Sequence, residues 1–171
     1  LGLQASALIR DGGTLQIGIG CLGDAIVHFC RLRQRQSALY HQLLADWGIL
    51  ERHGDLIERI GGTRPFERGL YGASEMFVNG FLHLYRDGIL KRKVYDSVPL
   101  QRLLNEGAIT EAVDERTLRV LLERGVVPAR LTEADVGFLR KFGIFDDRVR
   151  YRDGDLVMGD TVRVPADLER P

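Results

Sequence analysis

The chain has few cysteines, no excess of charge of either sign and no long apolar run. Its two cysteines, Cys21 and Cys30, have no histidine near them at metal-ligand spacing, which argues against a zinc site or a disulfide framework. Basic and acidic residues both number 24, so the charge favours neither nucleic acid nor anionic lipid. No apolar run approaches the roughly 18 residues of a membrane span. We therefore expect no metal, nucleic acid or membrane partner, and the cytosol is the default compartment.

Several common catalytic motifs are missing as well. Ser74 lies in Gly72-Ala-Ser-Glu-Met without the second glycine of a serine hydrolase elbow, and there is no Walker pattern. The four histidines are dispersed along the chain and have no partner at metal spacing. Hydrolysis by a serine nucleophile and binding of nucleotide phosphates in a P-loop are therefore not indicated.

What is present is a globular composition. With 171 residues, 44% of them hydrophobic, the chain can bury a core as one domain or part of one. It begins at Leu1 without a methionine and is already patterned as folded structure. We therefore expect it to be a segment of a longer polypeptide, and a segment of this kind to be inactive by itself.

The first third of the chain predicts an α/β fold. Residues 14–17 form an almost continuously apolar strand, and the glycine-rich Gly18-Ile-Gly-Cys-Leu-Gly23 leads from it into a helix with apolar residues at helical spacing. Gly18, Gly20 and Gly23 satisfy G-x-G-x-x-G, the pattern of dinucleotide-binding loops. Strand, glycine loop and helix together predict an open sheet with flanking helices.

The pattern of the remaining chain is less uniform. A helix over 40–47 is expected to bury Tyr40, Leu43, Leu44 and Trp47, and residues 48–69 are expected to form loops with one short helix at 56–60. Leu70 and Tyr71 resume a strand, after which Ser74 is expected to cap a helix over 75–86 that buries Phe77, Phe81 and Leu84. Later helices are expected to start at Ser97, Asp114 and Thr132, and turns at Asp153-Gly154 and Gly159-Asp160 predict a C-terminal β-meander.

Glu75 is the carboxylate that stands out. It follows a short strand at the expected first turn of a helix, where open α/β sheets bind their ligands and where the helix end stabilises an anion. Glu75 is therefore a candidate nucleophile. Spacing alone favours the other interpretation, an ordinary acidic residue at a helix start.

Two longer stretches carry a family resemblance. DGGTLQIGIGCLGDAI and LYGASEMFVNGFLHLYRDGIL resemble the two consecutive signatures of the acetyl-CoA hydrolase/transferase family, the class I coenzyme A transferases related to 4-hydroxybutyrate CoA-transferase. Gln16, Gly18, Gly20 and Asp24 match the first signature. The second is matched by Ser74, Glu75, Met76, Asn79, Gly80, Leu84 and Gly88.

The resemblance implies a mechanism and a set of site residues. It implies that Glu75 attacks an acyl-CoA thioester to form an acyl-glutamyl anhydride and then a glutamyl-CoA thioester. It also implies that Gly18, Gly20, Gly23, Asn79 and Gly80 bind the substrate, with backbone amides available to a developing oxyanion. The coenzyme A thioester is then a substrate rather than a bound cofactor, and a carboxylate acceptor or water completes the reaction. A second copy of the chain is a further partner left open.

The resemblance does not extend over the whole chain. Gly23 stands where relatives usually have proline, and the linker between the two signatures is much longer. We expect a partial CoA-transferase-like α/β domain over 1–95, a helical insertion over 96–145, and a β-meander over 146–171 that returns toward the first domain. Two alternatives stay open: a non-catalytic or regulatory domain of the same fold, and a dinucleotide-binding domain.

Overall fold

The computed structural model describes residues 1–159 and 162–169, which form helices, strands and small sheets. The chain divides into two compact units, Leu1–Val94 and Tyr95–Pro171. We describe each unit by itself. No helix in the described ranges is long and apolar enough to cross a membrane.

Unit 1, residues 1–94, combines a two-stranded parallel sheet with five helices. Its elements in chain order are α1 (Gly2–Ala7), β1 (Thr14–Gln16), α2 (Cys21–Arg35), α3 (Ser37–Asp46), α4 (Ile49–Ile60), β2 (Tyr71–Ala73) and α5 (Asn79–Arg86). The expected order of strand, glycine loop and helix is confirmed. The open sheet is small.

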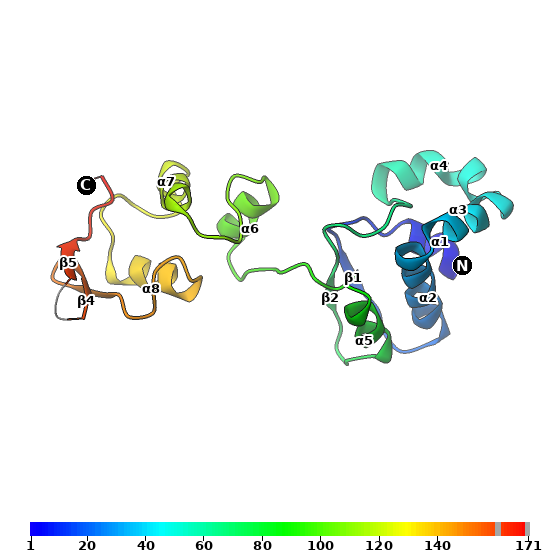
Figure 1. The fold of residues 1–171 in the computed structure, drawn as a ribbon, viewed down its shortest axis with the longest axis horizontal. Helices are drawn as coiled ribbons and strands as arrows, with labels where there is room; N and C mark the ends of the chain where they lie inside the picture. The colour runs from blue at the N-terminus through cyan, green and yellow to red at the C-terminus, as the bar shows by residue number, and fades with distance from the viewer. Residues whose placement is uncertain (160–161, 170–171) are drawn as a thin grey trace. The chain divides into compact units, whose positions relative to one another are not determined.

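The two strands of unit 1 lie side by side although 54 residues separate them in the chain (Figure 1). Their parallel register pairs Leu15 with Gly72 and Gln16 with Ala73. Leu70, the residue just before β2, also forms a parallel bridge with Leu90. Because the strands are parallel, the loops that follow them leave from the same edge of the sheet.

A compact core holds α2 and α5 against this sheet. Val27 and Cys30 of α2 pack with the strand residue Leu15 and with Phe81 and Leu84 of α5. Burial raises the pKa of the Cys30 thiol to about 12, so this cysteine stays protonated at neutral pH, as expected of a core residue.

An ion pair joins the end of α5 to α2. Arg31 Nε donates to the carboxylate of Asp87 at 2.7 Å, and Arg35 pairs with the same group. The Asp87 side chain is almost completely buried.

Two expectations for the segment between the glycine loop and β2 were wrong. Residues 49–60 form one helix, α4, where a loop with a short helix was expected, because Ile49 and Ile57 bury their side chains beside Tyr40 and Leu44. Trp47 is 67% exposed rather than buried, since α3 ends at Asp46.

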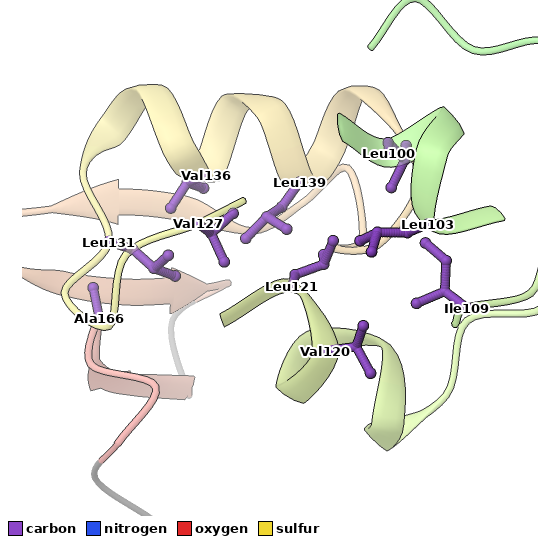
Figure 2. Close-up of a cluster of buried hydrophobic side chains, with 10 residues drawn as sticks. All are labelled: Leu100, Leu103, Ile109, Val120, Leu121, Val127, Leu131, Val136, Leu139 and Ala166. Carbon is purple, nitrogen blue, oxygen red and sulfur yellow. The ribbon is translucent and has the colours of Figure 1, made fainter. Parts of the chain in front are cut away.

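In unit 2, residues 95–171, the described residues form three helices and a three-stranded antiparallel sheet around one core (Figure 2). The helices α7 (Glu115–Glu123) and α8 (Glu133–Lys141) each begin with a reciprocal capping box, Asp114 with Thr117 and Thr132 with Asp135. All three expected helix starts are confirmed. The elements are α6 (Val98–Asn105), α7 (Glu115–Glu123), α8 (Glu133–Lys141), β3 (Arg150–Arg152), β4 (Asp155–Met158) and β5 (Val162–Pro165).

The strands of unit 2 form the expected meander. Asp153 and Gly154 make its first turn with positive φ angles of 50° and 90°; Asp160, in the second expected turn, lies outside the described residues. The meander was expected to return toward the first domain. It forms one compact unit with α6 to α8, in whose core Ala166 packs, and the return toward the first domain stays a prediction.

Candidate functional site

The two signature loops meet at the carboxyl edge of the parallel sheet. The loop over 17–20 follows β1 and the loop over 74–78 follows β2. The Ser74 hydroxyl lies 3.1 Å from the carbonyl oxygen of Ile17 and 2.6 Å from that of Met76, both of which are acceptors. This hydroxyl connects the two loops and fixes the turn in which Glu75 lies.

Glu75 is in that turn rather than in a helix. The expectation that Ser74 caps a helix over 75–86 was wrong: α5 begins at Asn79, with Val78 as its N-cap. Ser74 cannot act as the cap because its hydroxyl binds carbonyl groups in the two loops. Glu75 is exposed, and its side chain has no hydrogen bond or ion pair within the described residues. The helix-end contribution expected for this carboxylate therefore does not apply.

The three glycines of the first loop differ in backbone conformation and in the space around them. Gly20 caps α2 with a φ of +133°, a conformation that side-chain-bearing residues rarely adopt. At Gly18 an added Cβ would meet no atom of the described chain within 4 Å. At Gly23 an added Cβ would lie 2.8 Å from the Gly18 carbonyl oxygen, so this glycine lets the first turn of α2 approach the loop.

Asn79 and Gly80 occupy different environments. Asn79 is the exposed first residue of α5. Gly80 is buried, and an added Cβ would lie 2.6 Å from Val27 Cγ2 and 3.4 Å from Ile17 Cδ1. The arrangement gives Gly80 a packing role between α5 and α2, whereas Gly18, Gly20 and Glu75 lie in the two loops at the sheet edge.

A groove beside β2 was not anticipated from the sequence. It has a volume of about 470 Å³ and runs past Ser74. Phe77 was expected to face the core, yet it is 76% exposed and its ring stands 6.5 Å from that of buried Phe81. The signal in the sequence was the aromatic spacing Phe77, Phe81 and Tyr85, which places these rings along one side of α5 and its approach.

The glycines of the site allow a matched test. We expect Gly18→Ala to leave the melting temperature unchanged because its Cβ enters open space, whereas Gly80→Ala lowers it because Val27 must move. Thermal unfolding of both variants beside the parent chain measures this difference. Equal destabilisation by the two substitutions would contradict the packing role of Gly80.

No metal-binding cluster of histidine, cysteine, aspartate or glutamate occurs in the part of the chain that the structure describes. Comparisons of the chain with protein-family models, with curated proteins and with solved structures found no match.

Proposed function

We propose that this chain carries part of the active site of an acyl-CoA transferase or hydrolase in which Glu75 is the nucleophile. The observation that carries the proposal is the meeting of the two signature loops. The parallel pairing of β1 with β2, with Ser74 bound to the Ile17 carbonyl, brings Glu75 beside the loop that contains Gly18 and Gly20. β1 and β2 lie far apart in the chain, and their pairing brings the two loops that follow them together.

The exposed carboxylate suits nucleophilic attack. One Glu75 oxygen adds to the thioester carbonyl, and the C–S bond breaks to give an acyl-glutamyl anhydride and CoA thiolate. The thiolate then attacks the glutamyl carbonyl and releases the acyl group as a carboxylate, leaving a glutamyl-CoA thioester. An acceptor carboxylate repeats these steps in reverse to form a new acyl-CoA. Water attacking the anhydride gives hydrolysis instead.

The glycine loop suits the same reaction. Open space at Gly18 leaves room for a substrate to approach the backbone closely. Gly20 precedes the first turn of α2, whose unpaired N–H groups carry partial positive charge. Backbone amides in such a loop stabilise the oxyanion that develops when the carboxylate attacks.

Chemical trapping tests the covalent intermediate. Incubating the full-length protein that contains this segment with an acyl-CoA and then with hydroxylamine or borohydride is expected to modify Glu75, because both reagents attack a glutamyl thioester. Peptide mapping by mass spectrometry identifies the modified residue. Turnover without any adduct at Glu75 would remove this residue from the mechanism.

One observation favours dinucleotide binding as a second candidate. Gly23 allows α2 to approach the glycine loop closely, which is the role of the third glycine in the dinucleotide fingerprint. Glu75 follows the neighbouring parallel strand, as the ribose-binding acidic residue does in that fold, but it lies much further along the chain than the roughly 20 residues typical of the fingerprint. Thermal-shift titrations with NAD, NADP and acyl-CoA separate the two candidates, since the ligand bound by the native state raises its stability. Stabilisation by NAD alone would favour the second.

A further inference from the structure

The groove beside β2 runs between two chemically different ends. At one end lie Ser74, which is next to Glu75, and Phe77. At the other end lies Leu70, whose backbone N–H and carbonyl bind the segment that carries Lys91 and Arg92. Ser74 is the fourth residue after Leu70 along an extended chain, which puts the two roughly 13 Å apart.

The aromatic side chains extend along the groove. Phe77 lies before α5 and Tyr85 near its end, where Ile89 returns to bind Leu84 and Leu90 pairs with Leu70. Tyr85 therefore stands at the Lys91 and Arg92 end. Its side chain is 69% exposed, which leaves ring surface for a ligand.

The charge at the Leu70 end is positive and unpaired. Lys91 and Arg92 form no ion pair within the described residues, and no acidic side chain is among the described residues that line the groove. The stem of Lys91 lies against Gly69, where an added Cβ would be 2.3 Å from Lys91 Cγ. Two cations beside an exposed aromatic ring complement a phosphorylated purine nucleotide.

We propose that this groove binds the coenzyme A part of the substrate, with the nucleotide diphosphate at Lys91, Arg92 and Tyr85 and the pantetheine arm passing Phe77 toward Glu75. This inference rests on the proposed function for its choice of substrate. The volume of about 470 Å³ lies within the range of small-molecule sites. The extended arm of coenzyme A joins a diphosphate to a thioester, which matches a groove with cations at one end and Glu75 beside the other.

Binding of ADP to the full chain tests the nucleotide end without turnover. We expect Tyr85→Ala and the double variant Lys91→Ala/Arg92→Ala each to weaken ADP binding about tenfold or more in calorimetry. Tyr85→Phe keeps the ring and is expected to bind as the parent does, as is Arg59→Ala, which removes a cation outside the groove. Unchanged ADP affinity in the first two variants, or no ADP binding by the parent, would overturn the inference.

A truncated substrate tests the direction of the groove. The same two variants are expected to raise KM for acyl-CoA while leaving kcat/KM for acyl-pantetheine, which lacks the nucleotide, unchanged. Phe77→Ala is expected to lower kcat/KM for both substrates. Equal losses on both substrates in the Tyr85 and Lys91/Arg92 variants would contradict this placement.

The two proposals fail separately. Glu75→Gln is expected to bind ADP as the parent does, because Glu75 is beside the other end of the groove. Groove-dependent ADP binding without turnover would refute the proposed function alone, whereas trapping at Glu75 with groove-independent ADP binding would refute this inference alone.

Discussion

Replacing Glu75 by glutamine is expected to abolish acyl transfer and leave the fold intact. The neutral amide cannot form the anhydride, so turnover should fall by several orders of magnitude. The fold should not change because Glu75 is exposed and its side chain has no hydrogen bond or ion pair in the described chain. Steady-state kinetics with acyl-CoA and thermal unfolding, both on the full-length protein that contains this segment, measure the two effects.

The size of the loss at position 75 also depends on geometry. Glu75→Asp keeps the carboxylate but withdraws it by one methylene, and a misplacement of about 1 Å can cost about a hundredfold in rate. Glu58→Gln in α4 is the matched control, because Glu58 is exposed and lies outside the two loops. Near-normal turnover in Glu75→Gln would make the glutamate an ordinary loop residue.

The elements specified by local chemistry were predicted correctly. The reciprocal hydrogen bonds of Asp114 with Thr117 and of Thr132 with Asp135 join residues three apart, so the sequence alone indicates where α7 and α8 begin. The strand before Gly18 was also predicted, but its burial alternates, with Leu15 buried and Thr14 and Gln16 exposed, instead of following a continuous apolar run. Such signals need no knowledge of distant parts of the chain.

The elements that depend on distant contacts were not predictable. Serine is a common helix N-cap, but the Ser74 hydroxyl donates to the carbonyl of Ile17, 57 residues earlier in the chain. As a consequence, α5 starts at Asn79. Gly54 weakens the helical pattern of α4 locally, at about 1 kcal/mol relative to alanine. Burial of Ile49 and Ile57 in the core with Tyr40 outweighs that cost.

The candidate site combines both kinds of information. The sequence identifies Glu75 and the glycines Gly18 and Gly20 by their motifs. It does not indicate that the groove passes Tyr85 and Lys91, because that follows from the return of the chain after α5 to pair with Leu70. A site assembled by such a long-range pairing is visible only in the folded chain.

Arg33 lies in the polar stretch RLRQRQ, residues 31–36, yet it is only 1% exposed in unit 1. Its Nε donates to the carbonyl of Arg64 at 2.5 Å, and its Nη1 donates to those of Ile9 at 2.7 Å and Ser6 at 3.4 Å. The guanidinium carbon stands 4.0 Å from the centre of the Phe66 ring. One side chain thus joins α1, α2 and the segment before β2.

Arg33→Met is therefore expected to destabilise unit 1 by about 3 kcal/mol or more, because the carbonyls lose a charged donor and remain in a poorly solvated site. Arg33→Lys should fall between Arg33→Met and the parent, since an ammonium group cannot reproduce the planar fork that binds several carbonyls and stacks on Phe66. Urea unfolding followed by the fluorescence of Trp47, the single tryptophan of the sequence, measures the change in unit 1. Arg59→Met on the exposed side of α4 is the control. A stability of Arg33→Met equal to that of this control would mean that the carbonyls find other donors, and that Arg33 is not what joins the three segments.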